Sequence, residues 1–399
     1  MVKKILLLTL LLISLPALAA KRPIEPGAWR FEMRATYAVI PFVIDFKYQG
    51  NKLVGTLLNG KESIPLRDIH VKKNKIQIPL QHYENGLELE VKTRDLVLGD
   101  FVKYNKKPEF RIPVEGKRGP RERYSGKWLR PVRSLDGEWA VTLEEDDGKK
   151  SEGVLIFQQK GQRINGTVMS TTGDFRYFEG YVNGKFFEAA SFDGVYNYAI
   201  KGEVSKDKID GSILANWTIK FEGKKDPKAA LPDPYKQTQL EKLDFTFPDI
   251  DGRKVSLKDE RFRNKPVIVT FFGSWCPNCI DEANYLIPWY RKNKSRGVEI
   301  IALGFERSLT QAESRMQLTK IAKRLEMPFP VLLAGATAED KPMDKIPGLK
   351  NFISFPTTVF LNRNHEVVKV HAGFTGPSTG KHFREWKKEF NRDVDGLLR

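Results

Sequence analysis

The sequence predicts a multidomain fold in which an N-terminal all-β region is followed by a C-terminal α/β domain. The first observation is length, because 399 residues are too many for one ordinary hydrophobic core. The second is a change of pattern along the chain. Short alternating runs separated by turn signals fill residues 21–225, whereas strand-like runs alternate with helix-length amphipathic segments after residue 235.

The first twenty residues have the pattern of a secretory signal peptide. A basic start precedes an apolar run over residues 5–15, and small residues lead up to the expected cleavage after Ala19 or Ala20. A membrane anchor is the alternative, but the apolar run is well short of the roughly 20 residues that span a bilayer. We therefore expect a soluble mature protein in the periplasm or another extracytoplasmic space.

Composition and charge narrow the classes of partner. Hydrophobic residues make up 40% of the chain, which favours folded globular material over disorder. Without Lys3 and Lys4 the chain has 65 basic and 50 acidic residues, a net charge of about +15. Such a charge favours loose contact with anionic surfaces, including an anionic membrane surface. Nucleic acid is a poor candidate for an exported protein, and a solvated basic surface is the simpler interpretation.

The expected domain boundaries follow the changes in composition. Two linkers rich in glycine, proline or charge divide the chain. The parts are a signal peptide (1–20), a first β-rich repeat (21–113), a basic linker (114–134), a second β-rich repeat (135–225), a linker (226–235) and the α/β domain (236–399).

The β region contains signals for tight hairpins and for an internal repeat. Asn-Gly and Asp-Gly pairs suit hairpin turns because their residues accept positive φ. The motif Gly27-Ala28-Trp29, followed by Phe46 and Gly55-Thr56, recurs as Gly137-Glu138-Trp139, followed by Phe157 and Gly166-Thr167. Each copy is expected to form a small antiparallel barrel or sandwich with its tryptophan in the core. The six turn pairs begin at Asn59, Asn85, Asp136, Asn183, Asp193 and Asp210.

The linker 114–134 is strongly basic. Tyr124 and Trp128 lie within it, and this composition would suit an anionic membrane surface. A solvated connector with both aromatic side chains packed against a barrel is the favoured interpretation. Its basic residues are Lys117, Arg118, Arg121, Arg123, Lys127, Arg130 and Arg133.

Strand and helix patterns alternate in the α/β domain. Strands are expected over 266–272, 298–304, 330–334, 357–362 and 367–371. Helices are expected over 278–292, over 311–325 and from about residue 378 to the end. The buried stripe of the last helix is Phe383, Trp386, Phe390, Val394 and Leu397.

Cys276 and Cys279 are the only cysteines of the chain. A bridge over so short a loop stabilises a fold little, so a chemical use is favoured. The pair follows a strand and begins a helix, where unpaired N–H groups and the helix dipole lower a thiol pKa. We assign Cys276 as the attacking, more exposed thiol and Cys279, one turn on, as the resolving thiol. A structural zinc site would need four ligands, and no histidine pairs with the dithiol in sequence.

These residues resemble the TlpA/ResA class of exported thioredoxin-like oxidoreductases. Phe271-Phe-Gly-Ser-Trp-Cys-Pro-Asn-Cys279 is similar to the strand, motif and helix of that class, and Ser354-Phe-Pro-Thr-Thr358 to its loop with a cis proline. Gly373-Phe-Thr-Gly-Pro377 resembles the turn before its last helix. The resemblance implies a thioredoxin fold for the C-terminal domain and places a cis Pro356 beside the disulfide. It also implies a role in proton transfer for Glu282.

The sequence departs from ordinary thioredoxins at three places. Thr270 occupies the position of a buried aspartate, so the proton role is expected to fall on Glu282. The dipeptide Pro277-Asn278 differs from Gly-Pro, so a reduction potential cannot be carried over. Residues 308–349 form a longer insertion than a minimal thioredoxin has. Residues 269–276 do not fit the peroxiredoxin pattern, which disfavours peroxide reduction.

The expected function is exchange of disulfides with exported proteins, as a reductant rather than an oxidant. The clients are thiol- or disulfide-containing exported proteins, and the electron donor is unknown. Trp275, Pro277, Phe355, Pro356 and Thr357 are expected to bind the client around Cys276. No cofactor beyond the redox-active disulfide and no metal are expected. The alternative is an envelope binding or scaffold protein whose β region captures a ligand and whose C-terminal domain serves for docking.

Overall fold

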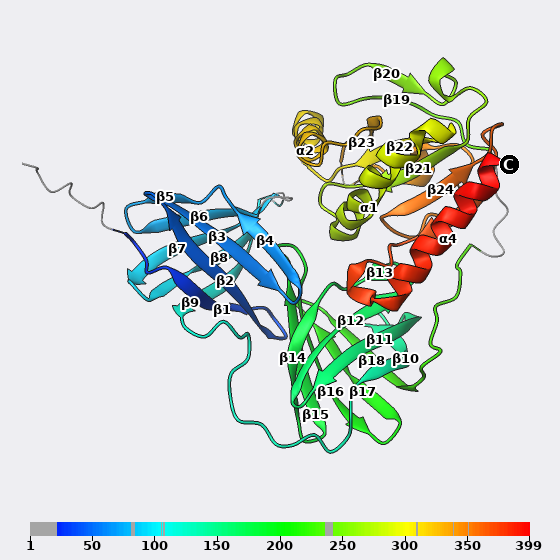
Figure 1. Cartoon of the computed structure of the whole chain (residues 1–399). Coiled ribbons are helices and arrows are strands. Elements are labelled where there is room, and N and C mark those ends of the chain that lie inside the picture. Colours follow the sequence, from blue (N-terminus) through cyan, green and yellow to red (C-terminus); the bar gives the residue numbers. More distant parts are fainter. Residues whose placement is uncertain are drawn as a thin grey trace, which may run out of the picture.

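The computed structural model describes residues 22–80, 84–104, 106, 108–235, 242–308, 310–337, 339–349 and 351–399, and the expected signal peptide lies outside them. Figure 1 shows one β unit on the left, a second below, and the C-terminal domain above the second. No helix in the described part of the chain is long and apolar enough to cross a membrane.

The first β unit is a nine-stranded antiparallel sheet with the order β4-β3-β2-β1-β9-β8-β7-β6-β5. No pairing among the described residues joins its two outer strands, so this sheet is open. Its strands are β1 (Gly27–Arg34), β2 (Val39–Gln49), β3 (Lys52–Asn59), β4 (Glu62–Leu66), β5 (His70–Lys72), β6 (Lys75–Leu80), β7 (Asn85–Thr93), β8 (Leu96–Lys103) and β9 (Phe110–Arg118).

The second β unit is a closed antiparallel barrel. Its strand order is β11-β10-β18-β17-β16-β15-β14-β12-β13, and pairing of β11 with β12 closes the ring. Its strands are β10 (Gly137–Glu145), β11 (Lys150–Lys160), β12 (Arg163–Ser170), β13 (Gly173–Asp174), β14 (Phe178–Asn183), β15 (Phe186–Phe192), β16 (Asn197–Ser205), β17 (Lys208–Leu214) and β18 (Thr218–Lys225).

The two copies of the sequence repeat share one strand register. Phe46 pairs with Gly27 and with Gly55, and Phe157 pairs in the same way with Gly137 and with Gly166. Trp29 and Trp139 are fully buried, and each indole N–H donates to the carbonyl of the residue four positions earlier. The internal repeat therefore corresponds to a structural duplication.

The hydrophobic cores of the two β units are not separate. Ala190, Phe192 and Ala199 of the second unit belong to the core of the first, and the ring of Phe192 lies 4.5 Å from that of Phe42. The guanidinium of Arg123, from the linker, is buried at this junction and donates to the carbonyl oxygens of Ala190 and Leu58. The two copies of the β region thus share one continuous core at their junction.

Some local predictions were wrong. Strand β9 continues to Arg118, five residues into the expected linker. Three of the six Asn-Gly and Asp-Gly dipeptides do not form the expected turns. Those at Asn85 and Asp210 lie within strands, and the one at Asp136 leads into β10. The other three form turns. Gly211 is in β17 for a packing reason, since a Cβ there would collide with the carbonyl oxygen of Lys201 in β16.

The C-terminal domain has a five-stranded sheet with the order β23-β22-β21-β24-β25, in which β21 is parallel to β22 and antiparallel to β24. Helices α1, α2 and α4 pack on one face, and the β19–β20 hairpin covers the other. This is the predicted thioredoxin fold. Its elements are β19 (Thr246–Pro248), β20 (Lys254–Ser256), β21 (Val267–Phe272), α1 (Pro277–Asn293), β22 (Glu299–Phe305), α2 (Gln311–Arg324), β23 (Val331–Gly335), α3 (Pro342–Lys345), β24 (Thr357–Leu361), β25 (Val367–Ala372) and α4 (Lys381–Leu398).

Two glycine substitutions test this account of strand packing. Gly211→Ala should destabilise the protein by about 1–3 kcal/mol, because the backbone of β16 would have to move. Gly396→Ala, in α4, meets no atom within 4 Å and should stabilise by up to ~1 kcal/mol through helix propensity. Thermal unfolding measures both, and equal midpoints for the two variants would contradict the packing argument.

Candidate active site

Cys276 and Cys279 form a disulfide at the N-terminus of α1. Cys276 is the N-cap, and its sulfur accepts a hydrogen bond of 3.2 Å from the backbone N–H of Cys279. Pro277 takes the first helical position, where its missing N–H costs nothing. The pairing and the helix start therefore agree with the sequence analysis.

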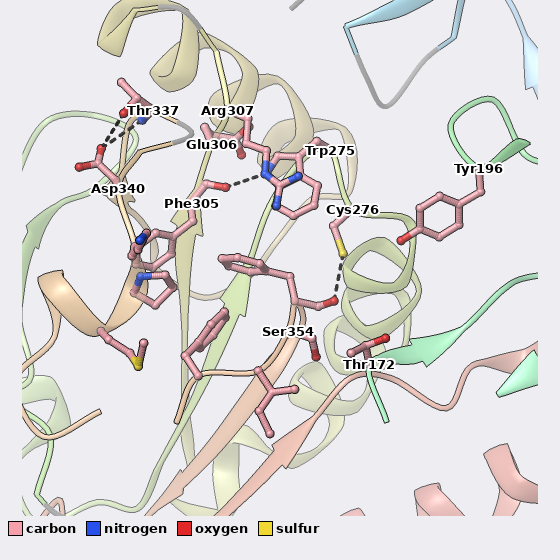
Figure 2. A pocket seen from close by; sticks show the side chains of 16 residues that line it. Thr172, Tyr196, Trp275, Cys276, Phe305, Glu306, Arg307, Thr337, Asp340 and Ser354 are labelled. Atoms are coloured by element: carbon pink, nitrogen blue, oxygen red, sulfur yellow. Dashed lines mark hydrogen bonds between the residues drawn. The ribbon is translucent and has the colours of Figure 1, made fainter. Parts of the chain in front are cut away.

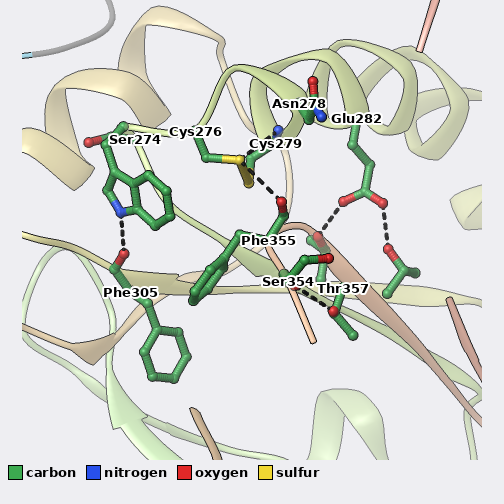
Figure 3. The surroundings of a disulfide bond; sticks show 12 residues. Ser274, Cys276, Asn278, Cys279, Glu282, Phe305, Ser354, Phe355 and Thr357 are labelled. Carbon is green, nitrogen blue, oxygen red and sulfur yellow. Dashed lines mark hydrogen bonds between the residues drawn. A yellow bond between two sulfur atoms is a disulfide. The ribbon is translucent and has the colours of Figure 1, made fainter. Parts of the chain in front are cut away.

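The loop before β24 lies against this disulfide. The Phe355–Pro356 peptide is cis, as the resemblance implies, and the sulfur of Cys276 lies 3.6 Å from the carbonyl oxygen of Phe355 (Figure 3). Thr357 is buried, and its hydroxyl donates to the carbonyl of Ser354 at 2.6 Å. The loop thus presents a backbone carbonyl directly at the sulfur of Cys276.

Glu282 is buried one turn beyond the dithiol, with 1% of its surface exposed, so it is not an ordinary surface residue of the helix. Its carboxylate accepts hydrogen bonds from the hydroxyls of Thr270 and Thr358. These threonines are direct cross-strand partners in β21 and β24, which explains why both reach one carboxylate. Burial raises the pKa of Glu282 to about 7, and the two hydrogen bonds oppose the shift.

A cavity of about 480 Å³ opens at Cys276. One wall comes from the C-terminal domain, where the indole N–H of Trp275 donates to the carbonyl of Phe305 and the guanidinium of Arg307 lies 3.3 Å from the centroid of the Trp275 ring. Figure 2 shows Thr172 and Tyr196, both from the second β unit, on the other side of Cys276. The cavity therefore belongs to both domains.

The turn between β12 and β14 holds the second β unit on the redox motif. The amide of Asn278 donates to the carbonyl oxygen of Asp174 at 3.1 Å. The carboxylate of Asp174 accepts hydrogen bonds of 2.7 Å from the N–H of Gly376 and from the hydroxyl of Ser378. Gly173 packs so closely on Asn278 that a Cβ there would collide with the amide. The turn leaves little room above the dithiol.

Arg176, next to this turn, forms ion pairs with three carboxylates. They belong to Glu62 in the first β unit, Asp193 in the second and Asp281 in α1. The side chain of Arg176 is only 7% exposed. Burial raises the pKa values of Glu62 and Asp193, while the positive charge of Arg176 opposes that shift. One guanidinium thus joins all three parts of the chain.

The predicted client-binding residues take two different places. Trp275 and Phe355 line the cavity, whereas Pro277, Pro356 and Thr357 are buried beside it. Cys276 lines the cavity too, yet only 1% of its surface is exposed, against 0% for Cys279. The expected difference in exposure is therefore small, because the β12–β14 turn and the cis-proline loop cover both sulfurs.

Sequence reasoning missed several cavity residues. Glu306, 2% exposed, accepts hydrogen bonds of 2.9 and 2.6 Å from the backbone N–H and the hydroxyl of Ser274, and burial raises its pKa to about 7. It follows β22, which is parallel to β21, so the shared sheet edge was a signal that could have found it. Thr172 and Tyr196 had no such signal.

Comparisons with known proteins find similarity in the C-terminal domain. Residues 239–382 match the Redoxin family. The thiol-disulfide oxidoreductase ResA of Bacillus cereus is 31% identical over 133 residues, which cover 33% of this chain and 68% of that protein. ResA of Bacillus thuringiensis subsp. konkukian is 29% identical over 145 residues, which cover 36% of this chain and 73% of that protein. A solved thiol-disulfide oxidoreductase from Bacteroides fragilis covers 36% of this chain and 96% of its own, at 16% identity and a TM-score of 0.28.

The raised pKa of Glu282 predicts a pH effect on stability. In the unfolded chain this carboxyl ionises near its ordinary value of 4.5, but in the folded protein only near 7, so its contribution to stability falls as the pH rises between those values. Glu282→Gln removes this loss. The stability of the variant relative to the native protein should therefore improve by roughly 3 kcal/mol between pH 4.5 and pH 8. Urea unfolding at both pH values measures this, and parallel pH profiles would refute it.

Proposed function

Because the chain belongs, through its C-terminal domain, to the ResA-like thiol–disulfide oxidoreductases, we propose that it exchanges disulfides with exported proteins through Cys276 and Cys279. The thioredoxin-like oxidoreductase activity follows from that membership. The observation that carries the assignment of the site is the position of Cys276, at the start of α1 and at the base of a cavity. A structural disulfide would not need a cavity at one sulfur.

The exchange proceeds in two substitutions at sulfur. In the reduced protein the Cys276 thiolate attacks one sulfur of a client disulfide, and the other client sulfur leaves as a thiolate and takes up a proton. Cys279 then loses its proton and attacks the Cys276 sulfur, which releases the second client thiol and forms the bond between Cys276 and Cys279. The client gains two electrons, and a separate thiol donor must return two electrons to the protein.

Residues around the dithiol support each step. The N–H of Cys279 points at the Cys276 sulfur and stabilises a thiolate there. Glu282 lies one helical turn beyond Cys279 and has a pKa near 7, which supports a role as the acceptor of the Cys279 proton during the second substitution. A client segment that pairs with the carbonyl of Phe355 would bring its sulfur to Cys276, between Trp275 and Tyr196.

We assign the reducing direction on the surroundings of the thiols. Both sulfurs lie in an apolar cluster formed by α1, α2, α4 and one face of the sheet, which disfavours a thiolate in the reduced state. A reduced state of higher free energy gives up its electrons more readily. The N–H of Cys279 and the N-terminus of α1 act in the opposite sense at Cys276, whereas the apolar surroundings act on both sulfurs. Export rests on the signal-like pattern of residues 1–20.

A trapping experiment tests both the exchange and the export. Cys279→Ser should accumulate a covalent adduct with a client, because nothing then resolves the mixed disulfide at Cys276. Cys276→Ser is the matched control and should trap none. Non-reducing gels of the envelope fraction reveal the adduct, and mass spectrometry should find that its chain begins at Ala20 or Lys21. If neither variant traps a client and the native protein does not reduce insulin, the proposal fails.

The direction of electron flow has its own test. The apolar surroundings of the thiols predict a reduction potential nearer to that of thioredoxin, ~−270 mV, than to that of DsbA, ~−120 mV. Equilibration of the whole protein with glutathione or dithiothreitol buffers, read by thiol alkylation, gives the value. A potential above about −180 mV would instead assign an oxidant or an isomerase.

A further inference from the structure

The connector between the two β units carries exposed apolar side chains that nothing above explains. Leu129 is 72% exposed and Val132 is 62% exposed, and Phe186, in the next hairpin of the barrel, is 54% exposed. Isolated exposed apolar residues are ordinary, but three on adjoining segments form a patch. We call these three residues the apolar tip.

Hydrogen bonds fix the connector to the β14–β15 turn. The N–H of Leu129 donates to the side chain of Asn183 at 2.8 Å, and the N–H of Val132 donates to the carbonyl of Gly184 at 2.9 Å. Trp128 stacks on Tyr181 of the barrel with a ring distance of 4.5 Å. The apolar tip is therefore held in place by the barrel.

This packing bears on the two interpretations of the linker 114–134. Tyr124 and Trp128, which composition alone suggested for a membrane, both lie against Tyr181 instead. Their packing matches the favoured interpretation of a connector whose aromatic residues cover the barrel. The exposed apolar surface belongs to other residues, which the sequence did not single out.

Positive charge surrounds the apolar tip. Lys127, Arg130 and Arg133 are exposed beside it, and within the described part of the chain none of them forms an ion pair. Lys185, in the same turn as Gly184, is paired with Glu203 at 2.7 Å and contributes less. Three unpaired cations around protruding apolar side chains are complementary to an anionic lipid head-group layer, where the charges stay at the surface and the apolar groups enter the acyl boundary.

We propose that the apolar tip and Lys127, Arg130 and Arg133 form a docking surface for an anionic phospholipid bilayer. A folded acidic protein would need specific contacts that fix its position on this surface. The three cations have no acidic partner among the described residues, and such freely exposed charges suit a fluid layer of lipid head groups. Figure 1 shows the connector at the lower end of the second β unit, opposite the C-terminal domain. Docking there would hold the redox site away from the membrane and open to clients.

Vesicle binding of the whole protein tests the proposal. Vesicles with 30% phosphatidylglycerol in phosphatidylcholine should bind the protein at physiological salt, and pure phosphatidylcholine should not. Lys127→Gln/Arg130→Gln/Arg133→Gln should weaken binding on the order of 100-fold, since each cation near an anionic surface contributes about fivefold. Leu129→Ser/Val132→Ser/Phe186→Ser should weaken it at least tenfold. Unchanged thermal midpoints and insulin reduction show that the variants are folded.

A matched control separates docking from general adsorption. Arg384→Gln/Arg392→Gln/Arg399→Gln removes three exposed cations at α4 and its C-terminal end that form no ion pair among the described residues and lie away from the apolar tip. This variant should bind vesicles within threefold of the native protein. Three results would overturn the proposal. The two variants that lack basic residues could lose equal vesicle affinity, or the serine variant could bind vesicles normally. The native protein could also bind an acidic protein but not vesicles. None of these results bears on disulfide exchange.

Discussion

The ion pairs of Arg176 are the interaction on which the architecture of the site depends. One buried guanidinium faces Glu62, Asp193 and Asp281, which come from three different parts of the chain. Removing the guanidinium would leave three carboxylates close together in a poorly solvated place, and an uncompensated buried charge is far more costly than a surface one. The arrangement therefore fixes helix α1, and with it the dithiol, to the β region.

This constraint changes the redox site from a surface feature to an interdomain one. In the C-terminal domain alone, Trp275 and Phe355 would edge an open surface around Cys276. With the second β unit in place, Thr172 and Tyr196 form a facing wall, and the sulfur is reached through a cavity of about 480 Å³. For the proposed exchange, a client would have to enter as an extended or flexible segment, because a flat folded surface could not approach the sulfur. The β region thus limits the shape of any molecule that can reach the dithiol.

The sequence predicts the parts of the site whose signals are local. The strand before Cys276 and the helix after it follow from local patterns, and the cis Pro356 and the place of Glu282 follow from the resemblance of short motifs to the TlpA/ResA class. Asp174, Arg176 and Tyr196 escape prediction because their contacts with the motif span about 80 to 105 residues of chain and leave no periodic pattern. The sequence also does not predict that one β unit is a closed barrel and the other an open sheet, since both copies carry the same local signals.

A comparison of the two copies explains why the second copy, and not the first, contacts the dithiol of the C-terminal domain. In the first copy, Gly55 pairs with Leu66 and Leu58 pairs with Ser63. Between these two pairs, each strand has two residues. In the second copy, Gly166 pairs with Phe178 and Met169 pairs with Asp174. Between these two pairs, one side has two residues and the other side has three. The extra residue belongs to a break between β13 and β14 over residues 175–177, and the middle residue of that break is Arg176, with φ of +66°. A one-residue difference between two similar hairpins thus aims the guanidinium at Asp281 and sets the adjoining turn over the dithiol.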